Sequence, residues 1–152
     1  MTPSSKITSG RIILSIIAVF TTVAPFLADW NASHIGNPLW PPHAKFHNAQ
    51  TMTMAVLLGL SALFFTWRLG NGRRAALLPS LLFTTMYWIT QAVSFLYPGV
   101  SWTDLNLLKP GQSLSQFPPQ LMLDFLIFNL AAVAAWAIAT AMPKSKKIDK
   151  PG

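Results

Sequence analysis

Residues 29–51 read DWNASHIGNPLWPPHAKFHNAQT, and this stretch separates two apolar runs that are long enough to cross a membrane. It contains all three histidines of the chain, His34, His43 and His47, and one of only four acidic residues, Asp29. Titratable groups gathered at the edge of a bilayer are costly to hold there and usually serve a function. We therefore expect the functional site beside this stretch.

The composition excludes an ordinary soluble domain. The chain has 152 residues, enough for one domain, and only 10% of them are charged, whereas soluble domains carry about 25% charged residues. The absence of Cys excludes disulfide bonds, thiolate metal sites and a cysteine nucleophile. The net charge of +7 favours anionic lipid head groups over nucleic acid as a partner, because the basic residues flank apolar runs.

Four apolar segments reach the length of about 20 residues that a helix needs to cross the hydrocarbon, the first of them only if it continues through Asp29. The sequence thus predicts an all-α fold, a four-helix bundle that spans the membrane, in a single domain over residues 1–142. A basic tail that we expect to be disordered follows at residues 143–152. The predicted spans cover about residues 12–29, 46–67, 75–97 and 120–142.

The distribution of Lys and Arg predicts the orientation, since cytoplasmic loops of membrane proteins are rich in both. Nine of the eleven basic residues lie before the first span, between the second and third, or after the fourth. We expect both termini in the cytoplasm, where anionic head groups bind that face, and residues 29–51 and 98–119 on the outer or lumenal side. The expected localisation is the plasma membrane in a bacterium or the endoplasmic reticulum in a eukaryote.

A helical face with two histidines is predicted at the start of the second span. His43, His47, Gln50 and Met54 follow one another at intervals that a helix places on one face, and Pro41-Pro42 suits the first turn. Two imidazoles one turn apart can relay a proton or share a metal ion. In the metal alternative, a Zn²⁺, Cu²⁺ or Fe²⁺ ion is bound by an aspartate and the imidazoles, namely Asp29, His34, His43 and His47.

Asp124 is the one acid well inside an apolar segment, one turn into the fourth span. The positive end of the helix dipole stabilises a carboxylate in that position, so capping of the helix is one explanation. The other is that the acids and the histidines face one pocket that opens outward and act there in acid/base catalysis. On that hypothesis the catalytic residues are Asp29, His43, His47 and Asp124.

Polar and aromatic side chains of the third span complete the predicted pocket. Tyr87, Gln91 and Ser94 share one helical face, and an amide inside hydrocarbon must find a partner. The partner is either another helix or a substrate. Aromatic rings beside a carboxylate suit a cationic or carbocation-like ligand through the ring quadrupole. The predicted ligand-binding residues are His34, Trp40, Tyr87, Trp88, Gln91 and Ser94.

The layout of the chain resembles the EXPERA superfamily, which includes emopamil-binding protein, a sterol isomerase, and the sigma-2 receptor. The matching features are Asp29 at the end of the first span, Pro41-Pro42 in the loop, the basic turn Arg68–Arg74 and the lysine-rich tail. The resemblance covers most of the chain and implies a ligand-facing role for Asp29. Where the family has a second pocket acid, this chain offers His43 and His47, so shared chemistry would have to use imidazole.

We therefore expect an integral membrane protein that binds an apolar, sterol-like or terpenoid-like small molecule and acts on it, without a cofactor, as an acid/base isomerase or cyclase. One alternative is a metal-dependent membrane oxidoreductase with His and Asp ligands. Another is a non-catalytic membrane subunit. The chain has no P-loop and no GxGxxG motif, and no nucleic-acid partner is expected. A homodimer is compatible with the sequence.

Overall fold

The computed structural model describes residues 1–68, 74–101, 103, 110–111 and 118–142. Within these residues the chain forms four long helices and one short 3-10 turn, without a strand, so the all-α prediction is confirmed. The predicted tail at 143–152 lies outside the described residues, as does most of the loop before the fourth helix. The elements are α1 (Pro3–Asp29), α2 (Pro42–Arg68), η2 (Arg74–Ala76), α3 (Leu77–Ser94) and α4 (Pro119–Ala141).

Two helices begin earlier than the apolar pattern predicts. The hydroxyl of Thr2 caps α1 by accepting from the backbone N–H of Ser5 at 3.2 Å, and Pro3 occupies the first turn, where its missing N–H is no loss. Polar residues that flank the predicted first span are therefore helical. Pro42 begins α2 in the same way. His43 and His47 therefore lie inside α2, as predicted for a helix that starts at Pro41-Pro42.

The third helix is shorter than predicted, because it ends at Ser94 instead of continuing to Tyr97. Past Ser94 the backbone N–H groups bond three residues back, as in the 2.9 Å bond from Leu96 N–H to the Val93 carbonyl. Pro98 and then Gly99, which has φ +77°, follow. Neither continues a helix, since Pro removes a donor and a positive φ suits Gly alone.

Among the described residues, three helices are long and apolar enough to cross a membrane: α1, α2 and α4. Helix α3 has 18 residues, which span about 27 Å at 1.5 Å per residue. Bulky apolar side chains cover the outer faces of the helices and are exposed, among them Ile16, Leu57, Phe64, Phe125 and Val133. So many exposed large apolar side chains are typical of helices that face lipid.

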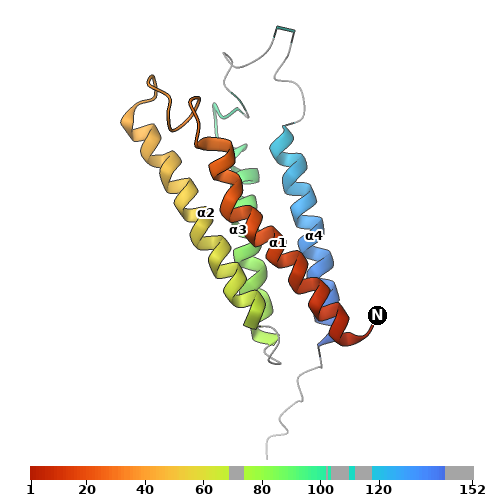
Figure 1. Cartoon of the computed structure of the whole chain (residues 1–152). Coiled ribbons are helices and arrows are strands. Elements are labelled where there is room, and N and C mark those ends of the chain that lie inside the picture. Colours follow the sequence, from red (N-terminus) through yellow and green to blue (C-terminus); the bar gives the residue numbers. More distant parts are fainter. Residues whose placement is uncertain (69–73, 102, 104–109, 112–117, 143–152) are drawn as a thin grey trace, which may run out of the picture.

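Helix α1 crosses the bundle diagonally, between α2 on one side and α4 on the other, with α3 behind it (Figure 1). Both α1 and α3 contact all three other helices. The start of α1, the end of α2, the short turn η2 and the end of α4 lie together at one end of the bundle (Figure 1). We call this the basic end, because it carries Lys6, Arg11 and Arg68. The opposite end carries all three histidines and is called the histidine end.

Two glycines let α1 approach its neighbours closely. A Cβ atom on Gly59 of α2 would lie 2.6 Å from the Ala18 carbonyl oxygen of α1. A Cβ atom on Gly10 of α1 would lie 2.9 Å from the carbonyl oxygen of Ala134 on α4. Both distances are shorter than any real contact of a Cβ atom with a backbone oxygen. Small residues at such crossings are how membrane helices gain packing contacts without a hydrophobic driving force.

Buried side chains of the interior include a tryptophan that makes a hydrogen bond between helices. The Trp88 ring is 1% exposed, and its Nε1–H donates to the Thr21 hydroxyl at 2.9 Å. The same ring stacks on Phe20, with the centroids 5.6 Å apart. Trp88 belongs to one buried cluster with apolar residues of α1 and α4, including Leu14, Ile17, Ile127, Ala131 and Ile138. This core lies below the histidine end and supports the site described next.

Candidate functional site

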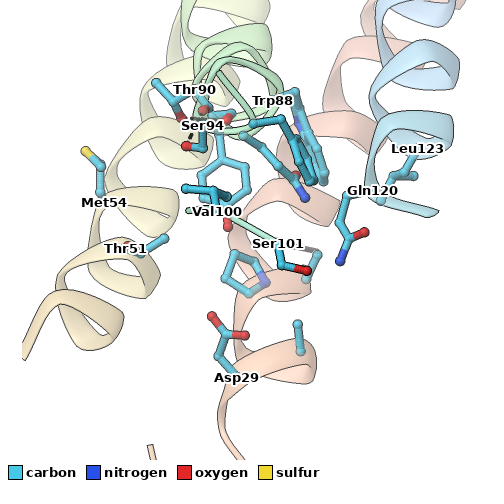
Figure 2. A pocket seen from close by; sticks show the side chains of 16 residues that line it. Asp29, Thr51, Met54, Trp88, Thr90, Ser94, Val100, Ser101, Gln120 and Leu123 are labelled. Carbon is cyan, nitrogen blue, oxygen red and sulfur yellow. Dashed lines mark hydrogen bonds between the residues drawn. The ribbon is translucent and has the colours of Figure 1, made fainter. Parts of the chain in front are cut away.

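A cavity of about 560 Å³ lies toward the histidine end of the bundle. Its volume falls within the range of about 300–1,000 Å³ that small-molecule sites occupy. Thr51 and Met54 of α2 lie on one side, Gln120 and Leu123 of α4 on the other, and Asp29 at one end (Figure 2). The remaining lining residues are Ala24, Pro25, Ala28, Tyr87, Trp88, Thr90, Gln91, Ser94, Phe95, Val100 and Ser101.

The lining has an acid but no base. Among its sixteen described residues Asp29 is the one with a formal charge, and none is Lys, Arg or His. Three aromatic rings, Tyr87, Trp88 and Phe95, share the cavity with that carboxylate. A negative charge surrounded by rings and apolar side chains attracts a cation or a hydrogen-bond donor, through the charge and through the ring quadrupoles.

Asp29 is the last residue of α1, and two partners hold its carboxylate. Asn48 of α2 donates from Nδ2 to Oδ2 at 2.8 Å and so ties α1 to α2 at this end. The Nε2 atom of His34 lies 3.9 Å from Oδ1, an ion pair whenever the imidazole is protonated. The side chains of Asp29 and His34 are 22% and 34% exposed. The pair therefore extends from the cavity, which Asp29 lines, to the solvent-exposed surface of the protein at His34.

The loop after α1 folds so that His34 returns to the end of the helix. The Oδ1 atom of Asn31 accepts from the backbone N–H groups of Ser33 at 2.9 Å and His34 at 3.2 Å. This side-chain turn is a common role of Asn. The backbone N–H of Ile35 also donates to the Asp29 carbonyl at 3.2 Å. Trp40 packs edge-on against the His34 ring, with centroids 5.3 Å apart, and does not belong to the described lining.

The predicted face of α3 does line the cavity. Tyr87, Gln91 and Ser94 are all lining residues, together with Trp88. The Ser94 hydroxyl donates to the Thr90 carbonyl at 2.8 Å. The Oε1 atom of Gln91 is buried and has no hydrogen-bond partner within the described part of the chain. A buried amide oxygen without a donor is costly, so Gln91 has an acceptor to offer a ligand in the cavity.

Asp124 lies beneath the cavity rather than in its lining. It is 2% exposed, and neither carboxylate oxygen has a hydrogen-bond partner among the described residues. Gln120, one turn earlier on α4, and the adjacent Leu123 both reach the cavity. Because α4 begins at Pro119 and has no acid in its first turn, the carboxylate caps no backbone N–H. The predicted capping role is therefore not what the structure shows.

The two histidines of α2 lie away from the cavity. His43 and His47 are exposed, with their Nε2 atoms 3.0 Å apart, and Nδ1 of His47 lies 3.3 Å from Oε1 of Gln50. The predicted face thus exists, and its continuation through Thr51 and Met54 reaches the cavity. His47 precedes Thr51 by one turn, so the pair lies beyond the cavity on the same stripe of α2.

The acid and imidazole groups that the sequence grouped together form two separate pairs. Asp29 binds His34, and His43 contacts His47. In the described part of the chain, no group of three or more His, Asp or Glu side chains lies close enough to hold a metal ion. The predicted set Asp29, His34, His43 and His47 is therefore not brought to one point.

Several lining residues were not expected from the sequence. Thr51 and Thr90 are neutral side chains inside long helices, and threonine is too common there to mark a site. Pro25 lies inside α1, where a proline indicates a kink rather than a binding site. Gln120 carried a usable signal, because it lies one turn before Asp124 and both are polar within an apolar segment. That pair indicates a polar face on α4 directed into the bundle.

Comparisons with other proteins give a family but no activity. No curated protein and no solved structure matches the chain. A family model matches residues 13–138. This range includes the cavity, the Asp29–His34 pair and the His43–His47 pair, and it extends from α1 almost to the end of α4. Since this range covers well over half of the sequence, the chain belongs to a family of unknown function, DUF6640.

Proposed function

We propose that this protein is an integral, multi-pass membrane protein that binds an apolar small molecule, sterol-like or terpenoid-like, with one polar or cationic head group held at Asp29. The observation that carries the proposal is the cavity of about 560 Å³, whose described lining has one carboxylate and no basic group. Apolar and aromatic side chains cover most of the remaining lining, as in small-molecule sites generally.

The proposal includes a four-span topology with both termini in the cytoplasm. Helix α3 is packed against all three other helices and so lies at the same depth as they do. At the basic end, Arg11 lies over the Trp67 ring and Lys6 over the Trp136 ring, each 5.6 Å from the centroid. Basic residues beside tryptophan are typical of the cytoplasmic interface, where anionic head groups bind.

The topology can be tested cleanly because the chain has no Cys. Single cysteines at Ser4 and Ser33 are introduced separately, and intact spheroplasts or sealed microsomes are treated with a maleimide that does not cross membranes. In spheroplasts, whose outer face is exposed, we expect labelling at position 33, and labelling at position 4 only after the membrane is opened. In sealed microsomes, whose cytoplasmic face is exposed, we expect the reverse order. Labelling of both positions from one side would contradict the four-span arrangement.

The head-group preference is tested with two probes that share one tail. Dodecylamine carries a positive head and dodecanoic acid a negative one, so nonspecific partition of the tail is matched. We expect the amine to raise the unfolding midpoint of the protein in nanodiscs, because ligand that binds the native state stabilises it. The acid should not, since its carboxylate would face Asp29. Equal shifts from both probes would remove the proposed role of the carboxylate.

Proton transfer at the same cavity is the second candidate, and the Asp29–His34 pair favours it. An isomerisation delivers one proton to a carbon–carbon double bond and withdraws another from a neighbouring carbon, so it needs an acid, its conjugate base and no oxidant. Asp29 lines the cavity and His34 connects it to the outer surface. On this proposal His34→Ala slows turnover of an unsaturated substrate while its affinity is kept. If His34→Ala lowered turnover and affinity equally, His34 would contribute to binding only and not to proton transfer.

The other predictions gain less support from the geometry. Asp124 has no contact with His43 or His47, which lie outside the described lining. The family match assigns no activity, so the resemblance to the EXPERA superfamily stays a prediction. A three-histidine oxidoreductase centre has no counterpart among the described residues. The non-catalytic subunit is distinguished by the dodecylamine experiment, because a purely structural protein shows no preference for either head group.

A further inference from the structure

The histidine pair on α2 lies apart from the cavity and needs an explanation of its own. His43 and His47 occupy successive turns near the start of α2, and both side chains are exposed. Their Nε2 atoms are 3.0 Å apart, and the ring centroids are 4.5 Å apart with the planes at 81°. We infer that His43 and His47 form a two-ligand surface site for a divalent transition metal ion, with Cu²⁺ preferred.

The separation of the two nitrogens fits metal coordination. With metal–nitrogen bonds of about 2.0–2.1 Å, the 3.0 Å distance between the Nε2 atoms subtends an angle of about 95° at the metal. That is nearer to the right angle between neighbouring ligands in a tetragonal site, the geometry that Cu²⁺ and Ni²⁺ prefer, than to the tetrahedral angle of structural Zn²⁺ sites. Affinity for nitrogen ligands also rises toward Cu²⁺ among divalent first-row metals.

One of the two imidazoles is already held in the tautomer that binds metal. Nδ1 of His47 lies 3.3 Å from the Oε1 atom of Gln50. An amide oxygen accepts, so Nδ1 carries the proton and the lone pair on Nε2 accepts from the Nε2–H of His43. A metal ion would replace that shared proton. A ligating histidine almost always donates its other N–H in this way, which fixes the ring. Gln50 is thus a positioning residue, and its spacing on α2 places it on the face of the two histidines.

The surroundings leave room for the rest of the coordination sphere. Both histidines are exposed at the end of the bundle, so water completes the sphere of a bound ion. The third histidine is occupied elsewhere, since His34 lies beside Asp29 and packs on Trp40. An ion held by only two protein ligands can exchange with ions in the surrounding solution. The site is therefore a capture or sensing site on the outer surface and is independent of ligand binding in the cavity.

The test uses the full-length chain in nanodiscs of zwitterionic lipid, with any purification tag removed. Cu²⁺ alone is added, and bound copper is measured by dialysis with elemental analysis and by electron paramagnetic resonance. We expect one equivalent per chain, with hyperfine couplings from two nitrogens. His43→Ala and His47→Ala should each lower the affinity by more than the roughly tenfold loss typical of an outer-shell change, and Gln50→Ala should lower it by about that factor.

His34→Ala is the matched control, because it removes an imidazole from the same end of the bundle without touching the pair. It should keep wild-type copper affinity. A loss in His34→Ala equal to that in His43→Ala would overturn the two-histidine site in favour of a larger one. Equal copper binding by the wild type and all variants would show adventitious binding only. His43→Ala should also keep the response to dodecylamine, so failure of this site is distinguishable from failure of the cavity.

Discussion

The two ends of the bundle differ in how the helices meet. At the basic end α1 lies against α4 at Gly10, where there is no room for a Cβ atom, and cationic side chains cover Trp67 and Trp136. At the histidine end the helices leave a cavity, and buried polar atoms of Gln91 and Asp124 have no partner among the described residues. Arg11 Nε, at the basic end, is buried without a described partner as well. The two ends therefore differ in packing, since one is closely packed and the other is hollow.

This difference separates stability from function within a small protein. Close contacts between small residues hold the diagonal helix α1 in place, so the histidine end does not need to be filled. Unpaired buried polar groups lower stability and persist where function requires them. Variants at the two ends should therefore fail in different ways, and four substitutions test that expectation in order of the size of their effects.

The largest effect is expected at the basic end. Gly10→Val places a Cβ atom against the backbone oxygen of Ala134, and overpacking of this kind destabilises by about 1–3 kcal/mol. Unfolding in mild detergent, followed by circular dichroism, measures the loss. Thr8→Val is the control, because that side chain is exposed on the same helix. Similar midpoints for the two variants would show that the α1–α4 contact does not hold the bundle together.

Asp29→Asn tests the histidine end. It keeps the shape of the side chain but removes the charge from the cavity, and a hydrogen bond to a charged group contributes about 1.5–3 kcal/mol. We expect the affinity for dodecylamine to fall by about 10–100-fold, a factor of ten for each 1.4 kcal/mol. Thr53→Ala, an exposed position on α2, is the control. Retained affinity in Asp29→Asn would place the ligand elsewhere.

Asp124→Asn should raise the stability of the protein, whereas Gly10→Val should lower it. A buried carboxylate without partners is less favourable than a neutral amide of the same shape, so the variant should unfold later than the wild type by about 1 kcal/mol. The measurement is the same detergent unfolding curve. A lower midpoint would mean that the carboxylate has a stabilising partner, and the contrast between the two ends would lose its strongest example.

The smallest expected effect is the coupling between Trp88 and Thr21, which Trp88→Phe probes. It removes the 2.9 Å hydrogen bond to Thr21, and bonds between membrane helices average about 0.6 kcal/mol. A double-mutant cycle with Thr21→Val isolates that bond from the packing of the ring. We expect a coupling energy near this average. No coupling would indicate that ring packing alone keeps Trp88 in the core between the two ends.

The sequence is sufficient to predict the helices but not their rotation. Hydropathy and proline positions give four helices, and helical spacing gives the His43–His47 contact and the face Tyr87–Ser94. Which way each face turns is set by the crossings at Gly10 and Gly59, and these depend on pairs of residues distant in the sequence. That is why His43 and His47 were expected in the pocket, although the structure places them beyond it.

The same reasoning explains the position of Asp124. A polar residue one turn into an apolar helix suggests either a cap or a pocket, and the sequence offers no choice between the two. The choice depends on where α4 begins, which is Pro119, and on which face the other helices cover. By contrast, the position of Asp29 beside the cavity could be predicted, since the end of the apolar helix fixes its proximity to the loop.

Photo-crosslinking tests the central claim most directly. A dodecylamine that bears a diazirine in its tail is irradiated with the protein in nanodiscs, and labelled peptides are identified by mass spectrometry. The account predicts adducts on the lining of α2 and α3, near Met54 and between Tyr87 and Phe95, and their loss in Asp29→Asn. Adducts confined to outward-facing residues such as Leu57 and Phe125, and equal in both proteins, would contradict it.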